Sequence, residues 1–372
     1  MSVKCQQIIS IIEDIAPKKL AEEWDNVGLL IGTTYMNIER VLVCLDINEE
    51  VVNEAIEKKV NLIISHHPLL FSPIQNIRWD NYKGKLIKEL ITNEIGVYCA
   101  HTNLDISSNG LNYWLSEMFQ LQDIQVLKKI NEEKMYKFVV FVPKSEIDAI
   151  KTELAKQGAG WTGNYSHCSF SSLGIGSFKP LEGSQPYRGS VNKIENIDEY
   201  RLETIIKEKD LFKTIKAVIK KHPYEEVAYD VYPLINKGLC EGLGVIGELS
   251  TEVDTRNFIK QVKNTLSIES LRASGKVPSK IKKVAICSGA GASLISKAKF
   301  SGADIFITGD LKYHDGQLAH ELGLFVLDAG HYNTEIIMIE CLADYLNKIR
   351  IKNNLKFDII KSKSNNDYIQ LL

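Results

Sequence analysis

The outer thirds of the chain alternate short apolar segments with amphipathic ones, and this alternation limits the possible folds more than any other feature. Residues 40–47 and 61–65 are β-branched, strand-like runs, and residues 49–59 between them have helical spacing. The same alternation of strand-like and helical segments continues through 83–119 and occurs again after residue 282. Strands that alternate with helices form parallel βαβ units whose helices cover the sheet. The two outer segments are therefore predicted to build one layered α/β domain with mainly parallel strands.

The middle of the chain follows a different order of elements. Its predicted strands and helices are, in sequence order, 134–143, 145–157, 168–180, 199–206, 210–222 and 225–234. The order βαββαβ is that of a ferredoxin-like unit, and the glycine-rich stretch 176–190 would be its long hairpin loop. We therefore predict an inserted domain at 126–237, with the two parts of the core domain at 1–125 and 238–372.

The composition excludes several classes of protein. The 45 Lys and Arg residues are balanced by 47 Asp and Glu, a net charge of −2, whereas nucleic-acid-binding proteins carry a strong basic excess. The seven cysteines form no C-x-x-C pair, which is typical of reduced core thiols rather than disulfides or zinc ligands. No apolar run is long enough to span a membrane, and residues 1–16 lack a signal-peptide pattern. We expect a cytoplasmic protein with no membrane or nucleic-acid partner.

Titratable side chains follow four of the predicted strands at the point where each strand ends. They are His66 and His67 after 61–65, His101 and Asp105 after 96–100, Asp310 and His314 after 303–308, and His331 after 324–329. The carboxyl ends of parallel strands meet at one edge of a sheet, where ligand sites commonly form. The sequence therefore predicts that these side chains share a site.

The residue types at that edge favour a metal centre. His331 and Glu335 are four residues apart on a predicted helix, so they share a face and can bind one ion. The adjacent His66 and His67 point in different directions and suit two neighbouring ions, or one ligand and one supporting residue. Taken alone, a His pair is usually a loop feature, Asp105 could be a turn residue, and a His–Glu pair could be solvated. The combination favours a two-metal site with open positions.

Five motifs in the outer segments together resemble one known family. They are EEWDNVGLLIG (22–32), ISHHPLLF (64–71), CAHTNLD (99–105), ITGDLKYHD (307–315) and DAGHYNTE (328–335). In this order they resemble the NIF-three-like dinuclear-metal proteins, which are often named type 2 GTP cyclohydrolase I homologues. The resemblance covers both outer segments, and it implies the layered NIF-three-like α/β core.

The resemblance also implies roles for particular residues. It implies one divalent ion held by His67 and Asp105 and a second held by His66 and His331, with Glu335 reaching both. Nitrogen and oxygen donors suit zinc, manganese, iron(II) or nickel, and zinc is the first choice. His101 and His314 match positions beside the site, where each could be a further ligand or a catalytic proton carrier. The implied substrate-binding residues are Trp24, Asp25 and Asn26, although Trp24 could equally serve core packing.

Beyond the site, the resemblance implies a ring-shaped homohexamer whose metal sites face an inner cavity. Longer members of the family carry an insert similar to PII-like or CutA-like domains, and residues 221–234 resemble the last strand of that module. The role of the insert is open at this point, because it could sense a ligand or only cap the ring.

Two kinds of function fit these features. The first is a metal-dependent hydrolase, in which a metal-bound hydroxide attacks a nucleotide-like substrate such as GTP. The alternative is a non-enzymatic metal-handling or regulatory protein whose insert senses a ligand. A two-metal phosphoesterase is a third reading, but the sequence lacks the additional Asp- and Asn-rich ligand motifs of that class.

Overall fold

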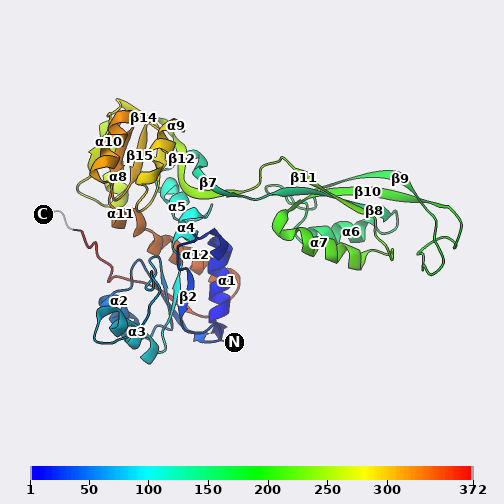
Figure 1. Cartoon of the computed structure of the whole chain (residues 1–372), viewed down its shortest axis with the longest axis horizontal. Helices are drawn as coiled ribbons and strands as arrows, with labels where there is room; N and C mark the ends of the chain where they lie inside the picture. The colour runs from blue at the N-terminus through cyan, green and yellow to red at the C-terminus, as the bar shows by residue number, and fades with distance from the viewer. Residues whose placement is uncertain (1, 370–372) are drawn as a thin grey trace. The chain divides into compact units, whose positions relative to one another are not determined.

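The computed structural model describes residues 2–369, which divide into two compact units (Figure 1). The first unit combines the residues up to Asn131 with those from Glu241 onward, so it contains both α/β segments of the sequence. The second unit comprises Glu132–Cys240. Each unit has its own hydrophobic core and is described by itself below.

One sheet of the first unit carries strands in the order β17-β4-β5-β6-β2. Its members are β2 (Gly28–Ile31), β4 (Arg40–Cys44), β5 (Leu62–Ser65), β6 (Gly96–Cys99) and β17 (Asp358–Lys361). The strands β17, β4, β5 and β6 are parallel, and β2 pairs with β6 in the antiparallel direction. Every residue of β5 and β6 is buried, as expected for central strands that are covered on both faces.

Two pairs of helices cover this sheet. Apolar residues of α1 (Cys5–Ile15) and α12 (Met338–Lys352) share one core cluster with residues of β4 and β5. Residues of α2 (Glu49–Glu57) and α3 (Tyr82–Thr92) form a second cluster with the alternate residues of the same strands. Because side chains alternate along a strand, the two clusters occupy opposite faces of the sheet.

The second sheet of this unit has the order β13-β16-β15-β14-β12-β7. Its members are β7 (Gln122–Glu132), β12 (Cys240–Asp254), β13 (Arg272–Ser274), β14 (Lys280–Ile286), β15 (Ile305–Thr308) and β16 (Phe325–Asp328). The central strands β14, β15 and β16 are parallel, whereas β12 and β13 are antiparallel to their neighbours. Both sheets are therefore mixed, with parallel strands at the centre. The sequence pattern reveals the buried central strands, but it does not give the direction of the flanking ones.

Helices also cover the second sheet, and short elements complete the unit. Residues of α5 (Leu111–Met118) and α8 (Thr255–Leu266) belong to one core cluster, and residues of α9 (Ile295–Phe300) and α10 (Tyr313–Leu322) to another. The remaining elements are β1 (Val3–Lys4), η1 (Lys18–Leu20), β3 (Asn37–Ile38), α4 (Thr102–Ile106), η2 (Ala292–Leu294) and α11 (His331–Glu335). The short helices α4 and α11 follow β6 and β16, and both carry predicted metal ligands.

The second unit is a four-stranded antiparallel sheet with two helices. Its elements, in chain order, are β8 (Met135–Pro143), α6 (Ile147–Lys156), β9 (Ser169–Phe178), β10 (Glu195–Lys207), α7 (Glu208–Lys221) and β11 (Tyr229–Leu234). The strands lie in the order β11-β8-β10-β9, and every pair is antiparallel. Both helices contribute to the core cluster of the sheet, and Figure 1 shows them on the same face.

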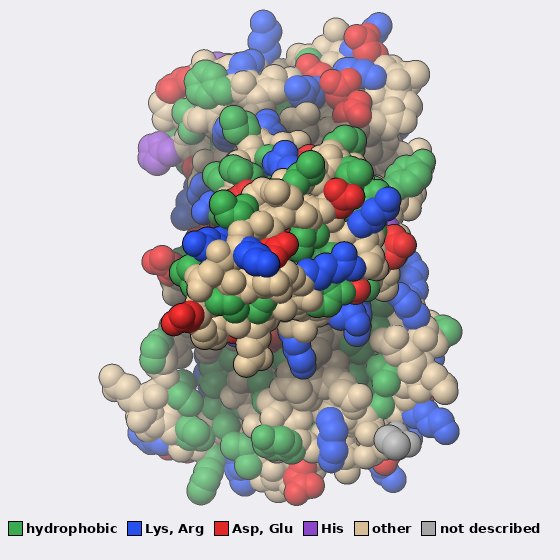
Figure 2. Space-filling view, turned by 90° about the vertical axis from the view of Figure 1, so that its right-hand side faces the viewer, with side chains coloured by type: hydrophobic (Ala, Val, Ile, Leu, Met, Phe, Trp, Pro, Cys, Tyr) green, Lys and Arg blue, Asp and Glu red, His purple; other side chains and the backbone are tan. Residues whose placement is uncertain are grey.

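Several general expectations can be compared with the structure. None of the helices within residues 2–369 is long and apolar enough to cross a bilayer. Cys44, Cys99 and Cys287 are buried thiols, and burial raises the pKa of each one. The face drawn in Figure 2 carries basic and acidic side chains interspersed, which matches the near-neutral net charge of −2.

Candidate metal centre

The ends of two strands and two short helices bring six of the predicted residues together. His66 and His67 follow β5, His101 precedes α4 and Asp105 lies within it, and His331 and Glu335 belong to α11. The ring centroids of His66 and His67 are 5.2 Å apart, and the ring of His101 lies 5.2 Å from that of His66. The ring of His331 lies 5.5 Å from that of His67. The strand-end rule, by which side chains that follow parallel strands meet at one edge of the sheet, thus predicted this cluster.

Glu335 stands at the centre of this cluster. It is only 3% exposed, and its Oε2 atom lies 2.9 Å from Nε2 of His67 and 3.0 Å from Nε2 of His331. Its Oε1 atom lies 3.8 Å from Nε2 of His66, which in turn lies 3.6 Å from Oδ1 of Asp105. One buried carboxylate therefore faces three imidazole rings, with a second carboxylate beside one of them.

The polar atoms at the centre lack ordinary partners. Nε2 of His66 and Oε2 of Glu335 are buried, and no well-aligned hydrogen bond reaches either atom from residues 2–369, although two imidazole nitrogens lie within 3.0 Å of that oxygen. Buried polar atoms are nearly always satisfied. The ligands of a tetrahedral zinc ion lie about 3.3 Å from one another, because each is about 2.0–2.1 Å from the metal. Convergence of unpartnered lone pairs at this spacing fits a bound cation.

All four histidines are held through their other ring nitrogen. The Nδ1 partners are Ala100 O for His66 at 2.8 Å, Asp46 Oδ1 for His67 at 2.8 Å, Asp25 Oδ1 for His101 at 2.9 Å, and Asp310 Oδ2 for His331 at 2.7 Å. A ring that donates from Nδ1 keeps the Nε2 lone pair for a metal, and such partners also fix the ring orientation. The arrangement is therefore typical of a metal-binding set of histidines.

The carboxylates make the cluster attractive to positive charge. Burial lowers the pKa of His67, but its hydrogen bond to Asp46 and the neighbouring Glu335 carboxylate outweigh it and raise the pKa to about 10. The Glu335 carboxylate is also the main reason that the pKa of His331 rises to about 9. Burial raises the pKa of Glu335, yet the surrounding imidazoles hold it well below its usual value. Without an ion, protons would supply the positive charge that these carboxylates favour.

Comparison with known proteins assigns the family. A model of the Duf34/NIF3 (NGG1p interacting factor 3) family matches residues 3–367. The chain belongs to the Duf34/NIF3 family. Two relatives named GTP cyclohydrolase 1 type 2 homolog are 41% identical in Halalkalibacterium halodurans, over 97% of each chain, and 44% identical in Bacillus subtilis, over 90% of each chain. The family resemblance that the five motifs predicted is confirmed.

Solved structures of other Duf34/NIF3 proteins have the same α/β fold. A Bacillus cereus protein related to NIF3 is 42% identical and superposes with a TM-score of 0.90, with full coverage of both chains. A Staphylococcus aureus protein is 32% identical with a TM-score of 0.79, covering 100% of this chain and 99% of the other. The similarity extends over the full length, so it includes the middle segment as well as the segments that carry the motifs.

The structure groups the ligand candidates differently from what the Duf34/NIF3 resemblance implied. The expectation joined His67 to Asp105 and His66 to His331. In the structure, His66 lies beside Asp105, and His67 and His331 flank the same oxygen of Glu335. The reason is that the fully buried His66 ring faces α4, whereas the ring of the next residue points toward α11. These side-chain distances favour a different pairing from the one that the resemblance implied, and the set of five residues is the same.

The structure gives new roles to three aspartates. Asp25, which the resemblance implied as a substrate-binding residue, holds His101 and accepts hydrogen bonds from the backbone and hydroxyl of Thr102. Burial raises the pKa of Asp25, but these hydrogen bonds lower it to about 2. Asp46 was missed in the sequence because the predicted strand 40–47 includes it, whereas β4 ends at Cys44 and leaves Asp46 just beyond the strand. Asp310 supports His331 from a left-handed backbone conformation, with a φ of 57°.

A glycine-rich loop forms a wall of the site and was also missed as part of it. The hydroxyl of Ser288 donates to Oδ1 of Asp105 at 3.3 Å, and the backbone N–H of Gly289 donates to Oγ1 of Thr334. A Cβ atom at Gly289 would lie 2.2 Å from Oε1 of Glu335, and its φ of 57° also favours glycine. Only a residue without a side chain fits this close to the carboxylate.

Three other predicted residues lie outside the cluster. Trp24 is 56% exposed rather than part of the core, and its ring lies 5.7 Å from Phe71 and 6.0 Å from His101. The amide of Asn26 donates to Leu70 O at 2.6 Å, which ties the two loops together. His314 is exposed on α10, where its contacts are with Tyr313 and Gln317, and the structure does not bring it into the cluster.

Proposed function

We propose that the chain binds two divalent metal ions. His66, Asp105 and Glu335 would hold one ion, and His67, His331 and Glu335 the other. The observation that supports this proposal most strongly is the pair of buried, unpartnered atoms, Nε2 of His66 and Oε2 of Glu335. Zinc is the first choice, because the donors are nitrogen and oxygen atoms, although manganese, iron and nickel accept the same donors.

We further propose that the centre is that of a hydrolase acting on a nucleotide-like substrate. Paired divalent ions supply Lewis acidity and lower the pKa of water. His101 is the residue of this chain best placed to carry a proton, since Asp25 fixes its Nδ1 and its ring adjoins His66. The exposed ring of Trp24 lies beside it and next to the exposed ring of Phe71, and the two rings offer a planar base a stacking surface. The name of the relatives, GTP cyclohydrolase 1 type 2 homolog, supports a purine nucleotide as the substrate.

A second candidate function is metal handling or regulation without catalysis. The observation in its favour is that the outer side of the centre is open to solvent. The side chains of His331 and Asp310 are 35% and 40% exposed, so an ion held there could exchange. This function predicts exchangeable metal and no nucleotide turnover.

We also propose that the second unit is a ferredoxin-like domain of the PII or CutA type and that the chain forms a ring-shaped homohexamer. The βαββαβ order and the strand order β11-β8-β10-β9 support the first statement. The second rests on the family resemblance. Light scattering coupled to gel filtration tests it: a mass of six chains is expected, and a monomer would contradict it.

A turnover screen tests the hydrolase proposal. The protein would be loaded with zinc, manganese or iron(II) and incubated with a panel of nucleotides that includes GTP, with products identified by mass spectrometry. Glu335→Gln removes the central carboxylate, and Glu340→Gln is the matched control, because Glu340 is exposed on α12. We expect product from wild type and Glu340→Gln only. Equal turnover by Glu335→Gln would contradict the hydrolase, and no product with any metal would favour metal handling.

A further inference from the structure

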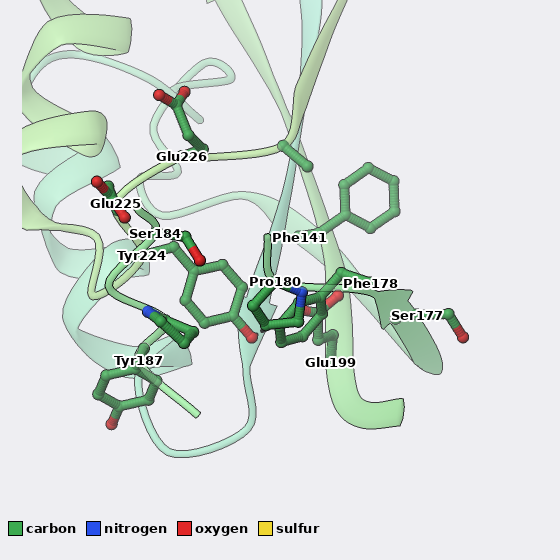
Figure 3. A pocket seen from close by; sticks show the side chains of 13 residues that line it. Phe141, Ser177, Phe178, Pro180, Ser184, Tyr187, Glu199, Tyr224, Glu225 and Glu226 are labelled. Atoms are coloured by element: carbon green, nitrogen blue, oxygen red, sulfur yellow. Dashed lines mark hydrogen bonds between the residues drawn. The ribbon is translucent and has the colours of Figure 1, made fainter. Parts of the chain in front are cut away.

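The second unit contains a cavity of about 430 Å³ that has no part in the proposed metal chemistry. All of its lining residues fall between Phe141 and Ala228, within the second unit. The walls come from β8, the end of β9, β10, the loop after β9 and the turn between α7 and β11 (Figure 3). A volume of this size is typical of sites for small organic molecules.

Aromatic side chains form much of the cavity wall. The ring of Tyr224 lies 6.3 Å from that of Phe178 and 6.0 Å from that of Tyr187, and Phe141 lines the same space. The guanidinium of Arg188, outside the lining, stands 5.7 Å from the Tyr187 ring centroid. Ring faces attract cations, and the attraction increases as water is excluded. One ring of this group therefore already faces a cation.

A buried carboxylate adds negative charge to the aromatic wall. Glu199 is 8% exposed, and its Oε1 accepts a hydrogen bond from the Tyr224 hydroxyl at 2.6 Å. Within residues 2–369, no hydrogen bond or ion pair reaches its Oε2. A Cβ atom at Gly176 would lie 2.0 Å from this oxygen, so the neighbouring strand leaves room for it only because residue 176 is glycine. A buried carboxylate without a cationic partner is costly, and a ligand could supply that partner.

The remaining charged groups of the cavity lining are also negative. Glu225 and Glu226 also line it, and the part of the lining that the structure describes includes no Lys or Arg. Glu225 already accepts a hydrogen bond from the backbone N–H of Gln185 at 2.8 Å, which holds the loop after β9 in place. Three carboxylates disfavour an anion in this space and favour a cation.

A histidine behind the wall links the backbones of two lining residues. Nδ1 of His222 accepts a hydrogen bond from the backbone N–H of Tyr224 at 3.1 Å, and its Nε2 donates to Phe141 O at 3.0 Å. Because Nδ1 accepts this hydrogen bond it carries no proton, and burial lowers the pKa of His222 in the same sense. The Tyr224 and Phe141 backbones are thereby held together.

We propose that this cavity binds a small organic cation. Its ammonium or guanidinium group would lie against the free oxygen of Glu199, and its apolar part would pack on the rings of Phe141, Phe178 and Tyr224. The site is separate from the metal centre and does not depend on the hydrolase proposal.

Calorimetric titration of the full-length protein with three matched probes tests this assignment. Phenethylamine carries the charge and a ring, phenethyl alcohol is its neutral analogue, and phenylacetate is the anionic one. The test variant is Glu199→Gln, which keeps the shape of the side chain and removes its charge. The matched control is Glu182→Gln, which changes an exposed carboxyl of the same loop outside the cavity. A thermal melt of each variant checks folding.

We expect the amine to bind wild type and Glu182→Gln equally, and at least about tenfold more tightly than the alcohol or the acid. Glu199→Gln should reduce amine affinity by at least about tenfold and leave the alcohol unchanged. If Glu199→Gln fails to fold, Phe141→Leu replaces it, and removal of one ring should weaken amine binding severalfold. Equal binding of the three probes, no binding of the amine at millimolar concentration, or unchanged amine affinity in the folded variant would each overturn the proposal.

Discussion

Replacing Glu335 with glutamine keeps the shape of the side chain and removes one negative charge from the centre of the proposed metal site. Its Oε2 atom lies 2.9 Å from Nε2 of His67 and 3.0 Å from Nε2 of His331, in a side chain that is 3% exposed. Loss of a group that merely supports a metal ligand costs about 10–100-fold in metal affinity. Because Glu335 would contact both ions directly, we expect a loss of at least about 100-fold, or about 2.7 kcal/mol.

Proton binding partly offsets this loss of metal affinity, so the measured effect of the substitution should depend on pH. In the metal-free protein, the pKa of His67 is about 10 and that of His331 about 9, and Glu335 contributes to both values. At pH 7, protons therefore compete with a metal ion for these rings. Glutamine at position 335 lowers both pKa values and eases the competition, which partly conceals the lost ligand. At pH 9 the competition in wild type is weaker, so the affinity deficit of the variant should be larger than at pH 7.

The assay is competition for zinc against a chelator of known affinity, at pH 7 and pH 9. Wild type, Glu335→Gln and the exposed control Glu340→Gln would be compared as full-length proteins. The control should match wild type at both pH values. Equal zinc affinity of wild type and Glu335→Gln at both pH values would refute the reasoning, because a deficit that proton competition conceals at pH 7 must grow as the pH rises to 9.

Three further predictions concern other parts of the first unit. Trp24→Ala removes an exposed ring beside His101, so nucleotide affinity measured by calorimetry should fall at least about tenfold while the metal content stays the same; unchanged affinity would exclude stacking. Burial raises the pKa of Glu54, but hydrogen bonds from Lys58 and Ser362 lower it overall. The ionised carboxylate therefore stabilises the fold at any pH above its ordinary pKa of 4.5. This contribution is lost as the pH falls through the lowered pKa of the folded state. Glu54→Gln should therefore reduce the free energy of unfolding in urea by about 1–2 kcal/mol at pH 7 and by less at pH 4, and an equal deficit at both pH values would contradict that sign. Removal of metal with a chelator should lower the melting temperature by roughly 5–10 °C, since ions that bind only the folded state stabilise it; an unchanged melting curve would argue against tight binding.

Local patterns in the sequence predicted the cluster because its geometry follows from chain topology. His66 and His67 directly follow β5, and a parallel sheet places that position beside the end of β6. The spacing of His331 and Glu335 is the spacing of one helical turn, and the short helix α11 brings Nε2 and Oε2 to 3.0 Å. These relations depend only on strand direction and helix period, so one sequence is enough to infer them.

The pairing of ligands and the supporting residues could not be predicted in the same way. Whether the ring of His66 or of His67 faces Asp105 depends on side-chain torsions at the strand end, which no sequence period encodes. The hydrogen bonds of Asp46 and Asp310 depend on tertiary contacts of 2.8 and 2.7 Å. His314 shows where the strand-end rule fails: the left-handed residue Asp310 turns the chain, and α10 begins at Tyr313 and carries the next residue to an exposed position.

The cavity of the second unit could not be predicted from the sequence for a related reason. Phe141, Phe178, Glu199 and Tyr224 come from different elements, and no short motif contains more than one of them. In the sequence, the region 176–190 is predicted as a long hairpin loop. The cavity beside this loop is lined by carboxylates and aromatic rings because the antiparallel pairing of β8, β9 and β10 brings residues together that are distant in the sequence.

The most direct test of the central claim is the anomalous scattering of zinc in crystals of the full-length protein grown with the metal. We predict two peaks per chain, one beside His66 and Asp105 and the other beside His67 and His331, with Glu335 within coordination distance of both. A chain with no peak at these residues, or with zinc bound only elsewhere on its surface, would contradict the proposed two-metal centre.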